Sequence, residues 1–151
     1  MSLRCFGVIH TWVNEMKRFE LIEHTADVGL IAYGETLAEA FANAAYAMFS
    51  IIAELDVVQE TESRRVEISE EDWEGLLFEW LNNLLYLFDV EMLLFKRFDI
   101  MEFGDSRLYA TCHGEKYDPS RHHLKTGVKS ATYHMLKVDR EKNQVQVIFD
   151  V

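Results

Sequence analysis

Two long stretches of helical periodicity, residues 35–52 and 70–91, interrupt a chain that otherwise alternates like β-strands. In both stretches apolar residues recur at three- and four-residue spacing, which is typical of a helix with one buried face. The segments around them are short alternating runs bounded by turn residues. The predicted order is β-β-α-β-α-β-β-β-β, which favours an α+β fold with two helices packed on a mostly antiparallel β-sheet.

Start signals place the two helices. Thr36 and Glu39 form a capping box at the first helix, because the threonine oxygen can accept a free N–H of the first turn. Ser69, with Asp72 three residues later, is the predicted start signal of the second helix. The last third is predicted to be all β, with strands at 92–103, 107–115, 128–138 and 144–151 and a longer loop at 116–127.

The length of 151 residues fits a single domain, because one core commonly serves about 100–200 residues. We assign this domain to residues 16–151. Residues 1–15 lack the apolar region of a signal peptide, so we expect an extension that is either poorly ordered or an added edge strand. No apolar run approaches the roughly 20 residues that a membrane-spanning helix needs.

The two cysteines, Cys5 and Cys112, are far apart in the sequence and have no metal-ligand spacing. Such a pair forms no disulfide framework, so a reducing, cytoplasmic setting is expected. Cys112 is expected to be a small buried apolar residue.

The chain has 26 acidic and 15 basic residues, a net charge of −11. Binding to a polyphosphate backbone needs a positive surface, and no run of lysine or arginine exceeds two residues. The charge argues against stable direct nucleic-acid binding. It favours a basic protein partner or hard cations.

The segment EHTADVGL, residues 23–30, gathers polar side chains between two apolar strands. Asp27 can bond its own downstream amides in a turn, or it can bind a ligand, and the residues leave both readings open. His24 is a possible ligand, although a single histidine beside apolar residues is more often a hydrogen-bonding core residue.

The chain ends with Asp150 and Val151. A side-chain carboxylate next to the main-chain carboxylate concentrates anionic oxygens, which is costly unless a cation or a basic group compensates them. Oxygen-only ligands select Ca²⁺, Mg²⁺ or Mn²⁺ over zinc. The alternative is a solvated terminus with both charges in water.

Lys129 lies in a predicted strand, and its face is expected to hold Ala131, Tyr133 and Met135. A lysine beside such a mostly apolar set either extends to solvent or meets an acid. The adjacent histidines at 122–123 are expected to be loop or surface contacts, because neighbours in an extended loop point apart and no Cys or His partner has a useful spacing.

Four segments together resemble the archease family: EHTADVGLIAYGETLAEAFANAAYAMF, LLFEWLNNLLYLFDVE, GEKYDPSRHHLKTGVKSATYHMLKV and the terminal VIFDV. They extend from about Phe19 to the last residue, and the combination is far more specific than any one segment. The extension before Met16 departs from the family pattern. His123 stands where the family often has a glycine, so no role is carried over to it.

The resemblance implies an accessory protein, not an enzyme. Its partner would be the RtcB-type RNA ligase, which joins tRNA exon halves after intron removal. The accessory protein would promote guanylylation of the ligase's own histidine and multiple turnover. The family's metal site, described with calcium, maps onto Asp27, Asp150 and Val151, and its functional lysine maps onto Lys129. His24 is then expected to support Asp27.

Two other functions stay open. One is a small metal-dependent phosphoester hydrolase that uses Asp27 and Asp150, with His24 as general base. No nucleophile elbow, P-loop, H-E-x-x-H or dinucleotide motif supports it. The other is a general chaperone or modulator of RNA-processing proteins. The sequence leaves the oligomeric state and the docking face open.

Overall fold

The computed structural model describes residues 17–24 and 27–151. Over this part the elements follow the predicted order: β1 (Phe19–His24), β2 (Asp27–Tyr33), α2 (Leu37–Ile52), β3 (Glu62–Ser69), α3 (Trp73–Glu91), β4 (Leu93–Phe103), β5 (Arg107–Lys116), β6 (Ser130–Asp139) and β7 (Gln144–Asp150). The predicted boundary between residues 15 and 16 lies outside the described residues.

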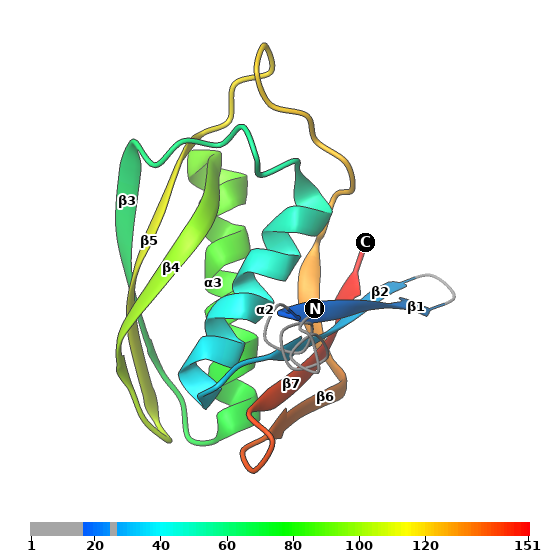
Figure 1. Ribbon diagram of the computed structural model, residues 1–151, viewed down its shortest axis with the longest axis vertical. Helices are drawn as coiled ribbons and strands as arrows, with labels where there is room; N and C mark the ends of the chain where they lie inside the picture. Colours follow the sequence, from blue (N-terminus) through cyan, green and yellow to red (C-terminus); the bar gives the residue numbers. More distant parts are fainter. Residues whose placement is uncertain (1–16, 25–26) are drawn as a thin grey trace, which may run out of the picture.

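The described strands form two antiparallel sheets. One has the order β1-β2-β7-β6 and the other has the order β3-β5-β4. Figure 1 shows α2 and α3 between the two sheets, and each helix contacts both of them. The predicted α+β class is confirmed, and the division of the strands between two sheets is the feature that the sequence pattern did not resolve.

Helix α2 begins as predicted. The Thr36 Oγ1 accepts the N–H of Glu39 at 3.1 Å, and the Glu39 carboxylate accepts the N–H of Glu35 at 2.5 Å. Four of its buried residues are alanines, which let neighbouring backbones approach closely: Ala40, Ala44, Ala45 and Ala47. Larger side chains of the same helix, Phe41, Met48 and Phe49, fill the core beside these alanines.

The predicted start of the second helix was wrong by three residues. The N-cap of α3 is Asp72, whose carboxylate accepts the N–H of Gly75 at 2.7 Å, whereas Ser69 is the last residue of β3. Two potential capping residues compete here, and the β3 ladder pairs Ser69 with Arg107 of β5. Pairing in the sheet therefore excludes Ser69 from the helix start.

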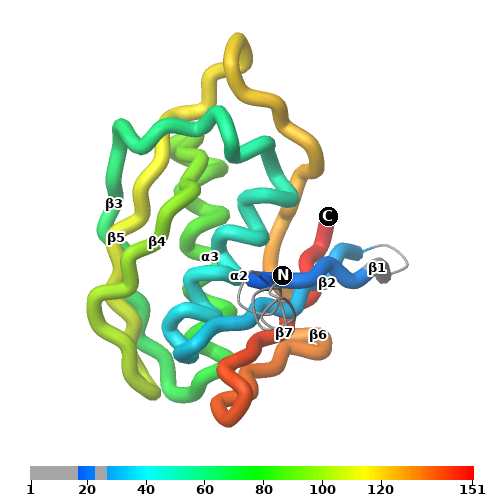
Figure 2. The backbone as a smooth tube through the Cα atoms, in the orientation of Figure 1, coloured from blue at the N-terminus to red at the C-terminus, as the bar shows by residue number. Residues whose placement is uncertain are grey.

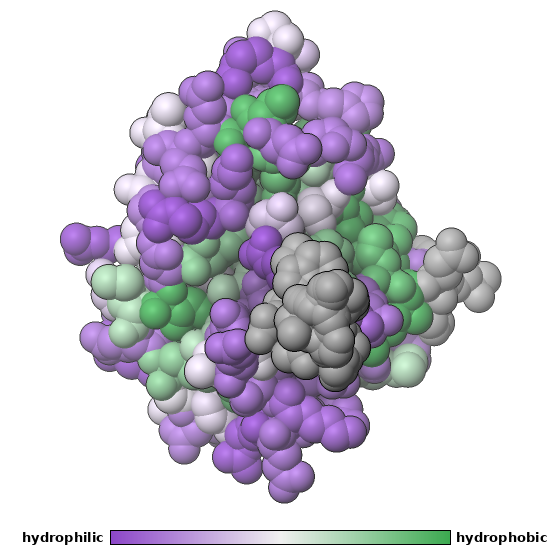
Figure 3. Space-filling model, viewed as in Figure 1, coloured by the Kyte–Doolittle hydropathy of each residue, from purple (hydrophilic) through white to green (hydrophobic). Residues whose placement is uncertain are grey.

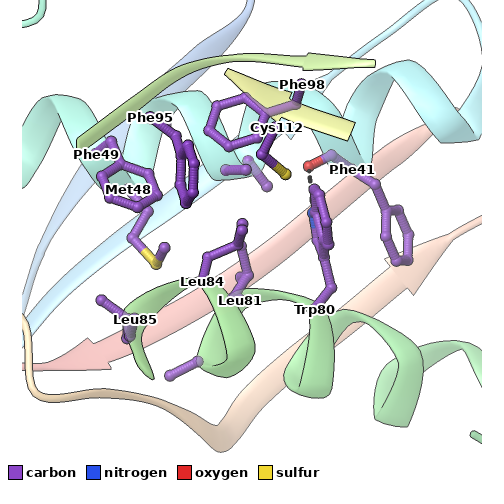
Figure 4. Close-up of a cluster of buried hydrophobic side chains, with 14 of the residues drawn as sticks. Phe41, Met48, Phe49, Trp80, Leu81, Leu84, Leu85, Phe95, Phe98 and Cys112 are labelled. Carbon is purple, nitrogen blue, oxygen red and sulfur yellow. Dashed lines mark hydrogen bonds between the residues drawn. The ribbon is translucent and has the colours of Figure 1, made fainter. Parts of the chain in front are cut away.

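The core lies between the sheets and is centred on both helices. Figure 4 shows Trp80 of α3 beside Phe41 of α2, where the indole N–H donates to the Phe41 carbonyl at 3.0 Å. Cys112 of β5 is fully buried in the same cluster, as predicted, and burial raises the pKa of its thiol to about 12. The thiolate is therefore negligible near neutral pH.

Hydrophilic residues cover most of the upper and lower parts of the face shown in Figure 3. Within the described ranges, no helix is both long and apolar enough to cross a membrane.

Strands β4 and β5 approach each other closely at Gly114. A Cβ at this position would lie 1.8 Å from the Leu94 carbonyl oxygen. Gly114→Ala is therefore expected to force β4 and β5 apart and to reduce the free energy of unfolding by about 2–3 kcal/mol in urea titrations.

Gly104→Ala is the matched control, since a Cβ there would meet no atom within 4 Å. It should change stability by no more than about 0.5 kcal/mol. Equal stability of the two variants would contradict the close approach at Gly114.

Candidate functional site: a carboxylate edge at the chain terminus

The ends of three strands bring the predicted carboxylates together. Asp27, the first residue of β2, is directly opposite Asp150, the last residue of β7. Asp150 is also opposite Ser130, the first residue of β6. Residues directly opposite in antiparallel strands share a face, with Cβ atoms about 4.5–5.5 Å apart. We call this set, with Val151, the carboxylate edge.

The carboxylate edge lies where the buried core ends. One residue inward, Val28 pairs with Phe149, which is fully buried. Asp27 is half-buried and Asp150 is exposed. Figure 2 shows the C-terminal end of β7 beside the β1–β2 hairpin. The core thus determines where the two acidic side chains lie.

Val151 is held in place at the end of the chain. It is half-buried and packs against the hydrophobic core. These contacts place the Val151 side chain, whereas its role as a metal ligand and the solvated alternative both stay predictions.

The donor atoms of the carboxylate edge fit a hard divalent cation. Two side-chain carboxylates and one main-chain carboxylate supply only oxygen, the ligand type that Ca²⁺, Mg²⁺ and Mn²⁺ prefer. Like charges directly opposite each other destabilise a strand pair, and a cation between them would remove that cost. In the described part of the chain, no group of three or more His, Cys, Asp or Glu side chains could hold a metal. The predicted site has two such side chains, and its third ligand is a main-chain group, so the metal site stays a prediction.

Only the backbone of His24 is described at this edge. It ends β1 and pairs with Asp27 across the hairpin. The turn residues between them lie outside the described residues, and the predicted supporting role of the His24 side chain stays a prediction.

Lys129 reaches the carboxylate edge through its backbone. The N–H of Lys129 donates to the Asp150 carbonyl at 2.8 Å, and Lys129 is exposed. Side chains beyond Ala131 do not alternate between the two faces of the sheet as expected. The reason is a register shift: β6 advances five residues, from Thr132 to Lys137, while β7 advances only two, from Ile148 to Gln146. The irregularity leaves two of the expected neighbours exposed, Tyr133 at 60% and Met135 at 54%.

Sequence reasoning missed a buried polar cluster that anchors the preceding loop. Glu115, at the end of β5, is buried and accepts the N–H of Gln59 at 2.8 Å. It also pairs with Arg121 and, at 2.8 Å, with Nε2 of the buried His122. Because His122 Nδ1 accepts the N–H of Asp118 at 2.8 Å, the ring proton lies on Nε2 and is donated to Glu115.

These contacts determine the charge state of Glu115. Burial acts to raise its pKa, but the hydrogen bonds from Gln59, His122 and Arg121 outweigh burial and lower the pKa from 4.5 to about 2. Of the two alternatives predicted for the adjacent histidines, His122 makes a buried loop contact, while His123 is exposed. Strand alternation could not reveal Glu115, because its partners lie in the following loop and at Gln59, which is distant in sequence.

The loop between β5 and β6 then docks on the end of α2. The N–H of Lys125 donates to the Ile52 carbonyl at 2.7 Å, and the His123 carbonyl accepts the N–H of Glu54 at 3.1 Å. The loop appears at the top of Figure 1, between the two sheets. It is therefore fixed by Glu115 at one end and by the carboxylate edge at Lys129 at the other.

Glu115→Gln should weaken the anchoring of this loop in a pH-dependent way. A lowered carboxyl pKa contributes stability that is present above about pH 4.5 and is lost as the pH falls towards about 2. The variant is expected to be less stable than the wild type at pH 6 and to lose less stability between pH 4.5 and 2, measured by urea unfolding.

Glu71→Gln, at an exposed glutamate, is the control. It should follow the wild-type pH profile throughout. If the stability of Glu115→Gln and of the wild type changed with pH in parallel, ionisation of Glu115 would not contribute to stability as predicted.

The comparisons with known proteins agree on one family. The model of the Archease protein family matches residues 19–151. Protein archease of Sulfurisphaera tokodaii is 40% identical over 137 residues, which cover 90% of this chain and 99% of that protein. Protein archease of Pyrococcus abyssi is 42% identical over 128 residues, which cover 83% of this chain and 90% of that protein.

Two solved structures have a similar fold. The solution structure of Methanobacterium thermoautotrophicum protein 1598 matches with a TM-score of 0.74 and 39% identity, covering 90% of this chain and 100% of that one. The crystal structure of a Thermotoga maritima archease, described as a possible chaperone, matches with a TM-score of 0.58 and 24% identity, covering 87% and 96%. The second likeness supports the fold alone.

Proposed function

This chain belongs to the archease family, and we propose that it is a protein cofactor of the RtcB-type RNA ligase in tRNA exon ligation. In this role it promotes GTP-dependent guanylylation of the ligase histidine and multiple turnover, and it is not itself an enzyme. The observation that carries the proposal is the carboxylate edge, where Asp27 and Asp150 lie opposite each other beside the chain terminus.

The proposal assigns a role to each group at this edge. Asp27, Asp150 and the Val151 carboxylate hold a divalent cation, with Ca²⁺ as the first candidate. The bound cation supplies positive charge that can stabilise a nucleotide phosphate. Lys129, whose backbone bonds to Asp150, contributes a further positive charge that contacts phosphate or balances the carboxylates.

The charge of the whole chain supports a protein partner. With a net charge of −11, stable direct binding of the chain to RNA is disfavoured. An RNA-binding ligase presents basic surface, to which an acidic protein is attracted. The cytoplasm is the proposed location, where such a ligase works on tRNA.

Asp150→Asn and Asp27→Asn test the carboxylate edge. Each removes one anionic ligand while keeping nearly the same shape, so calcium affinity in calorimetric titration should fall by about 10-fold or more. Stimulation of ligase guanylylation, followed with radiolabelled GTP, should fall in parallel. Asp105→Asn, at an exposed turn of the other sheet, is the matched control. Full stimulation by both edge variants would overturn the metal-centred proposal.

Lys129→Ala tests the lysine separately. Its side chain is exposed and its bond to Asp150 is made by the backbone, so the melting temperature should stay within about 2 °C of the wild type. Stimulation of guanylylation should fall, and Lys129→Arg should restore part of it by restoring the charge. Lys125→Ala, an exposed lysine of the same loop, should leave stimulation intact.

The same assays separate the alternative functions. Turnover of a phosphoester by the isolated protein, lost on Asp27→Asn, would favour the hydrolase. Equal effects on several unrelated RNA-processing proteins, insensitive to both aspartates, would favour a general chaperone or modulator.

A further inference from the structure

An exposed aromatic pair lies between α3 and β6, close to the carboxylate edge. The rings of Phe78 and Tyr133 stack with centroids 4.1 Å apart and an interplanar angle of 16°. Phe78 is half-buried, but Tyr133 is 60% exposed. A flat ring stacked on a second ring and open to solvent on its other side is a rigid platform for another planar group.

Three acidic residues act electrostatically on this platform. Burial against its neighbours and then the negative charges of Glu70, Glu79 and Asp72 raise the pKa of the Tyr133 hydroxyl, so all three acids lie within electrostatic reach of it. We call Phe78, Tyr133 and these three acids the α3–β6 surface.

The charge of this region is one-sided. Residues 70–91 contain seven acids and no lysine or arginine: Glu70, Glu71, Asp72, Glu74, Glu79, Asp89 and Glu91. Within the described part of the chain, Glu70, Asp72 and Glu79 form no ion pair. The nearby bases Lys137 and Arg140 are not paired with them either, and Arg140 lies over the Trp73 ring at 6.0 Å.

The backbone of β6 is irregular where it presents Tyr133. The extra residues between Thr132 and Lys137 form a bulge, and Met135 within it has a φ of 57°. Positive φ is uncommon for a residue with a long side chain, and bulges redirect side chains away from the sheet. The Gln146 amide donates to the Met135 carbonyl at 2.9 Å and holds this conformation.

The α3–β6 surface is joined rigidly to the carboxylate edge. The Asn82 side chain of α3 accepts the N–H of Ala131 at 2.9 Å and donates to its carbonyl at 3.5 Å. Ala131 lies between Ser130, which pairs with Asp150, and Tyr133. Three residues of extended chain span at most about 10 Å, so a partner held at Tyr133 has the carboxylate edge within reach.

We propose that the α3–β6 surface docks a basic protein surface through an arginine that stacks on Tyr133 and pairs with the surrounding carboxylates. Arginine fits because its planar guanidinium both stacks on aromatic faces and pairs with carboxylates. The acids repel phosphate, so neither RNA nor an anionic membrane is the occupant. The inference rests on the proposed function in one respect, namely that the partner is the RNA ligase.

Affinity for the purified cognate ligase tests this surface, measured by calorimetry at low and at physiological salt. Tyr133→Ala and Glu79→Lys should each raise the Kd about 10-fold or more, as expected for loss of an interface anchor. The effect of Glu79→Lys should shrink as salt rises, because screening weakens charge pairing. Glu79→Gln should give a smaller increase of the same kind.

Matched changes on the other sheet provide the controls. Met101→Ala removes an equally exposed apolar side chain of β4, and Glu102→Lys makes the same charge change there. Both should bind the ligase like the wild type.

The outcomes separate the two proposals. One outcome is that the wild type binds and stimulates the ligase while Tyr133→Ala and Glu79→Lys bind it as tightly as the wild type does. In that case docking through the α3–β6 surface is wrong and the proposed function stands. Equal weakening by Glu79→Lys and Glu102→Lys would also overturn it, because the effect would then follow net charge alone. A wild type that neither binds nor stimulates the ligase overturns both.

Discussion

The pairing of the last strand, β7, with two partners is the interaction on which the rest of the structure depends. β7 lies between β2 and β6, so its hydrogen bonds hold the first and the last parts of the described chain in one sheet. Its inward side chains, including the fully buried Val147 and Phe149, join that sheet to the helices. The same register places Asp150 opposite Asp27. Core stability and the geometry of the candidate site therefore cannot vary independently.

The loop between β5 and β6 connects this sheet to the other one. Its first part is held by the buried Glu115 and His122, and its last residue, Lys129, bonds to Asp150. A buried carboxylate is tolerable only with such partners, since an unpaired one would cost several kcal/mol. The loop thus has little freedom at either end. This explains how the backbone of Lys129, in a long connection, can have a defined position beside Asp150.

Local signals in the sequence predicted the local structure well. The periodicities gave the element order, Thr36 gave the start of α2, and the apolar surroundings of Cys112 gave its burial. The errors arose where distant residues compete. Ser69 and Asp72 are both good caps, and pairing with β5 decided between them. The bulge that exposes Tyr133 has no signal in an alternating segment, because it depends on the register with β7.

The sequence by itself determined the fold class, the acidic charge and the residue types at the candidate site, because periodicity and composition act locally. It also offered Asp27 and Asp150 as separate candidates whose roles the residues alone left open. Only the tertiary structure decided that they are neighbours, that Val151 packs on the core, and that Phe78 stacks on Tyr133. These facts follow from strand register and from which helix covers which sheet. Both depend on contacts between residues far apart in the chain, which no local pattern encodes.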